Sequence, residues 1–174
     1  MPSFQKVQFS DILKQYRMTH MVQDNVMYKQ VKISKINGVS LRGEKNGSEI
    51  GRKRQFIVDL DKYPNTIIFI RQGLAESAIG LAPKEVNKCI VTENMPLFSI
   101  DDGVNPILLQ LYFKSYHFRK QLNNIQALGT AQKSIHERTF LKLYIDLPNK
   151  NTQDEIVDYL KGREKQISTI ITEI

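Results

Sequence analysis

The sequence predicts an α/β (α+β) domain, in which a twisted sheet, mixed or mostly antiparallel, is flanked by helices and followed by an amphipathic helix of the coiled-coil type. Short segments between residues 28 and 100 alternate apolar and polar side chains, as strands with one buried face do. Apolar residues recur at helical spacing between residues 105 and 122 and again after residue 153. A chain of 174 residues has room for one well-buried core, so we expect one domain over residues 1–150 and the start of a helix over residues 151–174.

The first element expected is a short helix over residues 9–16. Ser10 is a residue type that caps helices, and Phe9 and Leu13 are spaced to pack on the body of the domain. Strands should follow at residues 28–33, 55–60, 66–70, 77–81, 88–92 and 97–100. Residues 66–70 are almost entirely β-branched or aromatic, which predicts a strand covered on both faces. Cys89 lies in an alternating segment and is expected to be a small core residue, not a nucleophile.

Asn105 followed by Pro106 predicts a helix start, because asparagine is a good N-cap and proline suits the first helical position. The apolar periodicity carries this helix to Leu122 and leaves a basic group toward solvent, namely Lys114, Arg119 and Lys120. Ser134 and Glu137 have the spacing of a capping box, so a brief helical turn is expected at residues 135–140 before a strand at residues 142–147.

A second capping box, between Thr152 and Glu155, predicts a helix from residue 153 to the C-terminus. Its apolar residues alternate spacings of four and three and so form a heptad seam: Ile156, Leu160, Ile167, Ile170 and Ile174. Arg163 interrupts the seam and Gly162 weakens the helix beside it. An isolated helix of this length gains little stability in water, so two interpretations stay open here. The apolar stripe pairs with a partner, or the helix folds back on its own domain.

The composition narrows the class of partner. A formal charge of +7 and a pI near 9.4 favour a polyanion. No apolar run approaches the roughly 20 residues that a membrane span needs. The N-terminus lacks the basic region and apolar stretch of a signal peptide. We therefore expect a cytoplasmic protein without a membrane partner.

Residue types suited to catalysis are scattered. The histidines, His20, His117 and His136, lie far apart, and none has a metal-ligand neighbour at helical or turn spacing. Gly43 and Gly47 surround a charged polar loop and do not form the phosphate-binding loop of nucleotide-binding proteins. The acidic residues form no cluster of the kind that magnesium-dependent nucleases need. We expect no catalytic residue, no metal site and no cofactor of the chain's own.

Basic residues are more informative. Residues 42–54 hold five cations and three glycines and are predicted to form a flexible loop that enters a strand. Lysine and arginine in such a loop can follow a phosphate backbone, and arginine, glutamine and asparagine can read base edges. Taken alone, the segment favours a solvated hairpin over a phosphate-binding loop. Further polar pairs follow a buried strand and precede the turn at residue 135, so the candidate nucleic-acid contacts are Arg42, Lys45, Arg52, Lys53, Arg54, Arg71, Gln72 and Lys133.

The most specific part of the sequence is an ordered string near its end. Its positions are Gly129, Ala131, Gln132, Lys133, Ile135, Leu141, Leu147, Pro148, Gln153, Ile156 and Val157. In order and spacing the string resembles the DNA-specificity subunit of type I restriction-modification systems, in particular one target recognition domain with the start of its spacer helix. Weaker matches extend this resemblance over most of the chain, at Tyr28 with Val31, residues 69–71, residues 91–92 and the helix from Tyr112 to Leu122.

The resemblance implies a non-catalytic chain that recognises one half of a split double-stranded DNA target. An adenine methyltransferase subunit would supply methylation with S-adenosylmethionine, and a restriction subunit would supply ATP-driven translocation and cleavage, so ATP and Mg²⁺ also belong to partners. The spacer helix would pair with its counterpart, which in a chain with one such helix implies a homodimer, and it would also dock the methyltransferase. The residues implied in these contacts are Ile156, Leu160, Ile167 and Ile170. A full subunit has two recognition domains and two long helices. One domain and one helix fit a half-size subunit that dimerises, a shortened chain or a degenerate gene.

Two other classes of function stay open. The chain could be a small restriction-type nuclease with its own cleavage site, although the scattered carboxylates argue against it. It could also be a protein-interaction module whose basic charge is incidental. Cutting of plasmid DNA by the pure protein with magnesium would establish the nuclease, and DNA binding without any dependence on sequence would leave only the interaction module.

Overall fold

The computed structural model describes residues 3–127 and 134–172, and the predicted fold class is confirmed. The strands are β1 Gln5–Gln8, β2 Leu13–Tyr16, β3 Thr19–Met21, β4 Met27–Ser34, β5 Gly38–Asn46, β6 Arg54–Ile57, β7 Thr66–Phe69, β8 Ile79–Leu81, β9 Ile90–Val91, β10 Leu97–Ile100 and β11 Tyr144–Leu147. The α-helices are α1 Phe9–Ile12, α2 Pro106–Phe113, α3 Tyr116–Ala127, α4 Glu137–Phe140 and α5 Lys150–Thr172. Short 3-10 turns occur at η1 Gly47–Glu49, η2 Leu74–Glu76 and η3 Lys84–Val86.

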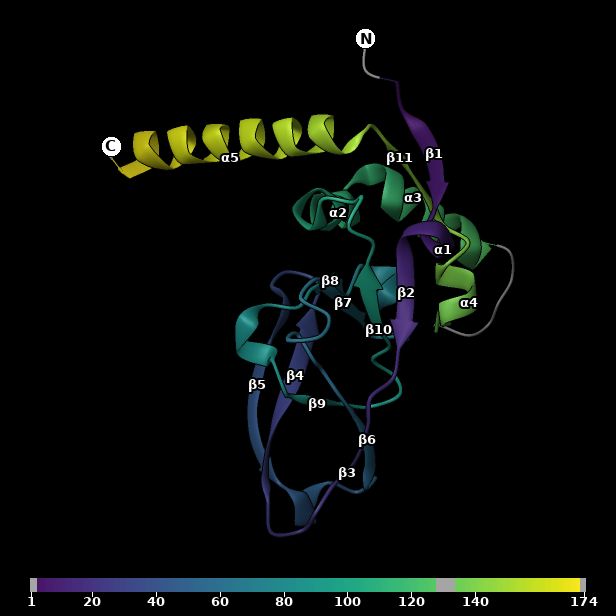
Figure 1. Ribbon diagram of the computed structural model, residues 1–174, viewed down its shortest axis with the longest axis vertical. Helices are drawn as coiled ribbons and strands as arrows, with labels where there is room; N and C mark the ends of the chain where they lie inside the picture. The colour runs from purple at the N-terminus through teal and green to yellow at the C-terminus, as the bar shows by residue number, and fades with distance from the viewer. Residues whose placement is uncertain (1–2, 128–133, 173–174) are drawn as a thin grey trace.

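The described strands form three sheets. The five-stranded sheet has the order β3-β6-β9-β4-β5 and is mixed, because β9 runs parallel to β4 while the other pairs are antiparallel. A four-stranded antiparallel sheet has the order β2-β10-β7-β8, and β1 pairs with β11. In Figure 1 the five-stranded sheet occupies the lower half, α2, α3 and α4 gather above it, and α5 projects to one side.

The main core is an aromatic cluster built around Phe9. Its ring lies 5.0 Å from that of Phe140, 6.0 Å from that of Phe113 and 6.2 Å from that of Phe118. All four side chains are buried. Such rings each bury roughly 150–250 Å² and favour tilted or edge-to-face contacts. The cluster therefore fixes α1 against α2, α3 and α4.

A second core cluster joins the two larger sheets. The Tyr16 hydroxyl lies 3.0 Å from Thr66 Oγ1, and both residues are buried. Cys89 has no exposed surface, and its burial raises the pKa of the thiol. This confirms Cys89 as a small core residue. All four residues of β7 are buried as well, which confirms a strand covered on both faces.

The N-terminal helix is shorter than predicted. It ends at Ile12, and residues 13–16 form β2, which pairs with β10. Gln8 occupies the N-cap in place of Ser10, and its backbone N–H donates to Asp11 Oδ2 at 3.2 Å. Residues 13–16 form a strand because the backbone N–H and C=O groups that a longer helix would pair internally are paired with β10 instead. Phe9 and Leu13 are buried as predicted.

The helix predicted from residue 105 to residue 122 is divided in two. Asn105 caps α2, since its Oδ1 accepts from two backbone N–H groups at 2.9 and 3.2 Å. The helix stops at Phe113, and Ser115 Oγ accepts from Phe118 N at 3.2 Å to start α3. Serine favours such local caps over helix interiors, so the break occurs where the apolar periodicity alone predicts continuity.

Candidate DNA interface and partner helix

Arg42 and Lys45 lie on β5, an edge strand of the five-stranded sheet, and both side chains are exposed. The pairing of β5 with β4 skips one residue at Arg42, which forms a β-bulge. Gly43 follows with φ +125°, a conformation that L side chains rarely adopt. The prediction of a flexible loop is therefore wrong for the first part of the segment, because a paired strand carries these two cations.

Arg52, Lys53 and Arg54 follow η1 and lead into β6. Arg52 Nη1 lies 2.8 Å from Glu93 Oε1, and Lys53 forms an ion pair with Asp24. Arg54 is exposed and has no ion-pair partner in the described part of the chain. Exposed ion pairs are typically worth less than about 1 kcal/mol, so a phosphate group can replace these carboxylates at little cost.

Arg71 lies in a different environment. Its Nε donates to Glu137 Oε2 at 3.0 Å and its Nη2 to Oε1 at 2.5 Å, and the two side chains are only 16% and 11% exposed. Burial raises the pKa of Glu137, but hydrogen bonds and charge from Arg71, with a hydrogen bond from Gln15, outweigh it and lower that pKa. The guanidinium of Arg71 thus joins the loop after β7 to α4, and its contact with DNA stays a prediction.

The capping box predicted between Ser134 and Glu137 at the start of α4 is wrong. His136 occupies the N-cap, but its side chain does not cap the helix backbone and instead lies with Nε2 3.3 Å from Ser134 Oγ. Glu137 is the first residue of the helix and turns its carboxylate to Arg71. A guanidinium is a stronger partner for a carboxylate than a backbone N–H, which explains the outcome.

Gln72 is exposed next to Arg71, at a point where three loops meet. Arg71 N donates to Asn94 O at 3.0 Å, and Ile135 N donates to Arg71 O at 2.9 Å. The loop after β7 is thereby joined to the loop after β9 and to the segment before α4. Lys133 lies outside the described residues, two positions before Ile135.

Arg17 is a further cation at this junction for which the sequence contains no signal, because it stands alone between two short strands. Its Nη2 lies 3.8 Å from Glu137 Oε1, and its side chain is 62% exposed. The guanidinium of Arg52 lowers the pKa of Glu93 most strongly, and those of Arg71 and Arg17 add to the effect. We call these five residues the arginine patch; three cations and two carboxylates leave it with a positive charge.

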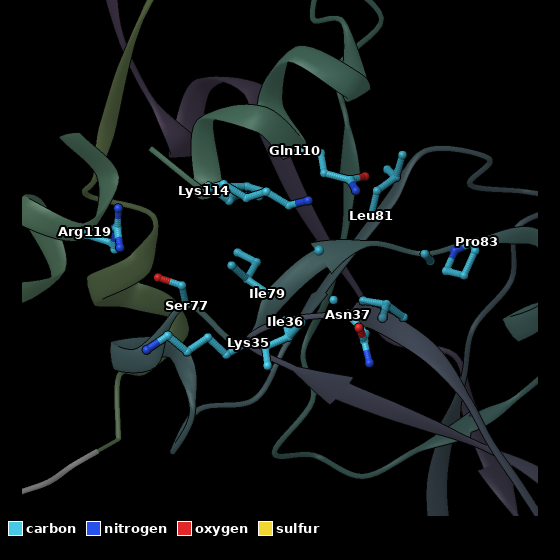
Figure 2. Close-up of a pocket in the computed structure, with 15 residues that line it drawn as sticks. Lys35, Ile36, Asn37, Ser77, Ile79, Leu81, Pro83, Gln110, Lys114 and Arg119 are labelled. Carbon is cyan, nitrogen blue, oxygen red and sulfur yellow. The ribbon is translucent and has the colours of Figure 1, made fainter. Parts of the chain in front are cut away.

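A separate group of cations surrounds a pocket of about 330 Å³ between the β4–β5 turn, β8 and α2 (Figure 2). Lys35 comes from the turn, and Lys114 and Arg119 come from the junction of α2 and α3. The helical periodicity places Lys114 and Arg119 toward solvent. It does not predict the pocket, because the pocket also needs the β4–β5 hairpin, which packs beside β8 and α2.

The helix α5 begins at Lys150, three residues before the predicted start. Asn149 caps it, because its Oδ1 accepts from Thr152 N at 3.0 Å and its carbonyl accepts from Gln153 N at 3.0 Å. The predicted capping box between Thr152 and Glu155 is therefore wrong. Asn149 is the stronger cap residue type, and it follows directly on the proline that ends the strand.

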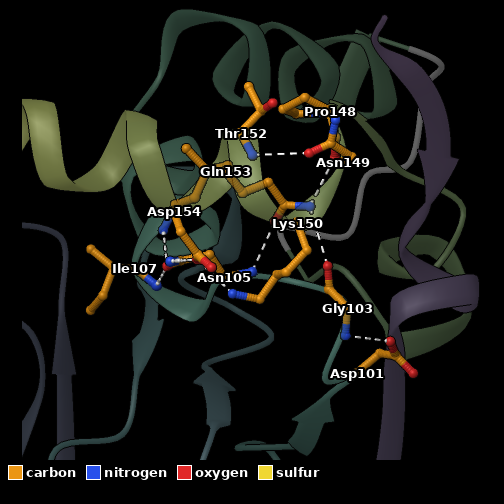
Figure 3. Close-up of polar contacts among 11 residues, drawn as sticks. Asp101, Gly103, Asn105, Ile107, Pro148, Asn149, Lys150, Thr152, Gln153 and Asp154 are labelled. Atoms are coloured by element: carbon orange, nitrogen blue, oxygen red, sulfur yellow. Dashed lines mark hydrogen bonds and ion pairs between the residues drawn. The ribbon is translucent and has the colours of Figure 1, made fainter. Parts of the chain in front are cut away.

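Gln153 joins the start of α5 to the rest of the domain (Figure 3). The side chain is 2% exposed, and its Oε1 accepts from Asn105 N at 2.8 Å. Its Nε2 donates to Pro148 O at 2.9 Å and to Gly103 O at 3.2 Å. Asn105 Nδ2 also donates to Asp154 Oδ1 at 2.6 Å. The residue that caps α2 thus holds the first turn of α5.

The heptad seam divides along the helix. Val157 is 2% exposed and Ile156 is half-buried, so the first turns of α5 pack on the chain's own domain. Leu160 is 42% exposed, Tyr159 is 63% exposed, and every side chain from residue 158 to residue 166 is exposed. Figure 1 shows this part of α5 extending away from the domain. Coiled-coil pairing stays a prediction, because the side chains of Ile167 and Ile170 lie outside the described residues.

No group of three or more His, Cys, Asp and Glu side chains within residues 3–127 and 134–172 is placed to hold a metal ion. No helix among the same residues is long and apolar enough to cross a bilayer.

Comparisons with known proteins agree with this geometry. The family described as type I restriction modification DNA specificity domain matches residues 7–174. An HsdS subunit from Thermoanaerobacter tengcongensis matches 97% of the chain with a TM-score of 0.72 and 17% identity. A structure described as the basis of complex assembly and conformational transition of the type I R-M system matches 98% with a TM-score of 0.75 and 16% identity.

At these identities, the structural likeness concerns the fold. The chain spans 44% of the length of each of the two matched chains. No curated protein sequence matches it. The family match covers nearly the whole chain and confirms the resemblance found in the string near the C-terminus. The chain belongs to the family of type I restriction modification DNA specificity domains.

Proposed function

We propose that this chain recognises double-stranded DNA as a specificity domain of a type I restriction-modification system and directs partner subunits to one half of a split target. The family match over residues 7–174 carries the proposal. The chain itself performs no chemistry in this proposal. An adenine methyltransferase subunit binds S-adenosylmethionine, and a restriction subunit uses ATP and Mg²⁺.

The proposed DNA contacts are the cations of β5 and of residues 52–54, the exposed amide after β7, and the lysine before α4: Arg42, Lys45, Arg52, Lys53, Arg54, Gln72 and Lys133. Lysine and arginine on paired strands present charge to phosphates in a fixed geometry, while the forked donors of arginine and glutamine can read guanine or adenine edges. Arg71, next to Gln72 and held by Glu137, stays a predicted contact of the same surface.

Selection from a duplex library with randomised positions tests the proposal. We expect one enriched sequence that binds roughly 10³-fold or more tightly than unrelated duplexes at physiological salt. Equal affinity for all duplexes would leave only a basic module without sequence recognition. Reproducible cutting of plasmid DNA by the pure protein with Mg²⁺ would instead establish the nuclease alternative.

The number of phosphate contacts can be counted from the salt dependence of binding. Replacing Arg42, Lys45 or Arg54 by glutamine removes one cation from the proposed interface. We expect each change to reduce the slope of log K against log salt by about 1, because one condensed counterion fewer is released. Fluorescence anisotropy with the selected duplex at four salt concentrations measures the slope. Lys142→Gln, at an exposed cation that is not among the proposed contacts, is the matched control, and a slope that falls equally there contradicts the assignment.

The projecting part of α5 is proposed to pair with a partner helix and to dock the methyltransferase. Leu160→Asp and Ile167→Asp place a charge in the seam and should abolish the larger species in size-exclusion chromatography with light scattering, either of the chain alone or with the methyltransferase subunit. Lys161→Asp introduces the same side chain on an exposed position outside the seam. Elution that is unchanged by both seam variants argues that α5 serves only its own domain.

A further inference from the structure

The pocket between the β4–β5 turn, β8 and α2 has an apolar floor. Ile79, Val39 and Phe113 line it and are nearly or fully buried, and Leu81 and Pro83 extend the apolar surface. β8 lies close to β5 here, since a Cβ at Gly80 would be in van der Waals contact, 3.4 Å from Val39 N. With about 330 Å³, the cavity has the size of a small-molecule site at the lower end of the usual range.

Three cations stand around this floor, and the residues that line the pocket include no carboxylate. Lys35, Lys114 and Arg119 are all exposed, and none has an ion-pair partner in the described ranges 3–127 and 134–172. Other cations of the chain, such as Lys88 and Lys150, are paired with aspartates. Three positive charges around one cavity repel each other, so an anion that enters the cavity relieves this repulsion.

Ser77 provides an independent observation at the same wall. Its Oγ is buried, and no protein group within the described residues forms a hydrogen bond with it. The backbone of Ser77 has φ 62°, a left-handed conformation that costs a residue with a side chain about 1 kcal/mol. In Figure 2, Ser77 lies on the same side of the pocket as Lys35 and Arg119, while Lys114 extends above Ile79. Strained residues and unpaired buried groups concentrate at binding sites.

We propose that this pocket binds an organic phosphate ester. The phosphate lies between Arg119, Lys35 and Ser77, where the planar guanidinium can donate two parallel hydrogen bonds and the hydroxyl can donate a third. The carbon skeleton of the ester covers Ile79 and Phe113. A dianion matches three cations better than a carboxylate does. This site is distinct from the DNA contacts proposed above, and none of its residues belongs to them.

Such an ester has two sources, a free small molecule or the sugar–phosphate backbone of DNA. Phenyl phosphate tests the chemistry that the two share, with inorganic phosphate and phenol as probes for the charged and the apolar part alone. In ¹⁵N NMR spectra we expect phenyl phosphate to shift the amide signals of Ser77, Ile79 and Gly80. Its affinity should exceed that of either partial probe by roughly tenfold or more. Equal affinity for phenyl phosphate and phenol, or shifts confined to other regions, would overturn the proposal.

Two independent variants test whether phenyl phosphate binds in this pocket. Glutamine at Lys35, Lys114 and Arg119 together should abolish the preference for phenyl phosphate over phenol, whereas Lys120→Gln, an exposed cation on the same helix as Arg119, should leave it intact. Ser77→Gly suits the positive φ, so the fold persists while affinity falls about threefold or more. Retained preference in the triple variant would refute the site.

A short duplex added to the phenyl phosphate complex distinguishes the two sources. Loss of the amide shifts on addition of duplex assigns the pocket to the DNA backbone, and shifts that persist assign it to a free phosphate ester. Because phenyl phosphate binding is measured without DNA, the pocket can fail while sequence recognition holds, and the reverse is equally observable.

Discussion

Replacement of Glu137 by alanine is expected to lower the free energy of unfolding by about 3–5 kcal/mol, because it leaves a buried guanidinium without its counter-charge. Arg71 is 16% exposed and makes both of its short hydrogen bonds to this carboxylate. The pair connects positions 66 residues apart, so its loss also loosens the junction of the loops beside Gln72. Urea unfolding followed by far-ultraviolet circular dichroism measures the change.

Arg17→Gln is the matched control for this experiment. Its guanidinium lies 3.8 Å from the same carboxylate but is 62% exposed, so we expect a loss below about 1 kcal/mol. The double variant with Arg71→Met and Glu137→Leu should be less destabilised than Glu137→Ala, since it removes both buried charges together. A loss from Glu137→Ala no larger than that from Arg17→Gln contradicts a structural role for the pair.

The pH dependence follows from the lowered pKa of Glu137. A carboxyl whose pKa is lower in the folded than in the unfolded state adds stability at every pH above the unfolded value, which is about 4.3. That contribution is lost as the pH falls through the lower, folded value. The difference in unfolding free energy between the natural chain and Glu137→Gln should therefore be constant from about pH 6 to pH 8 and shrink below about pH 4.

Glu137 also illustrates which parts of the fold the sequence predicts. Local patterns predict burial well, so the strand at residues 66–70, the core position of Cys89 and the cap at Asn105 are confirmed. The spacing from Ser134 to Glu137 fits a capping box, but in the structure the Glu137 carboxylate pairs with Arg71, 66 residues away in the sequence. No local pattern contains such a partner, and the long-range contact decides the outcome.

In the candidate interface, too, the sequence predicts the residues that are neighbours along the chain but not those that strand pairing brings together. Arg52, Lys53 and Arg54 stand out because they are adjacent in the sequence, and the structure places them together where β6 begins. Arg17 belongs to the arginine patch only because β2 pairs with β10 and brings it to Glu137. The bulge at Arg42 likewise depends on the register with β4, which one strand alone does not specify.

The second large effect is expected from Gln153→Ala. This change removes three hydrogen bonds, to Asn105 N, Pro148 O and Gly103 O, from a side chain that is 2% exposed. Buried backbone groups left without partners cost about 1–3 kcal/mol each, and water that enters recovers part of this, so we expect a loss of about 2–4 kcal/mol. Gln166→Ala, on an exposed position of the same helix, should change stability by less than about 0.5 kcal/mol.

Gln153 has a second expected effect, on the direction of α5. Because Asn105 caps α2 and also binds both Gln153 and Asp154, the first turn of α5 is fixed relative to α2. Gln153→Ala should therefore speed amide hydrogen exchange in residues 150–157 and weaken the complex with the methyltransferase subunit. It should leave affinity for the selected duplex within about twofold, because no proposed DNA contact changes. Equal losses of DNA binding and of subunit docking would show instead that Gln153 supports the whole domain and does not set the direction of α5.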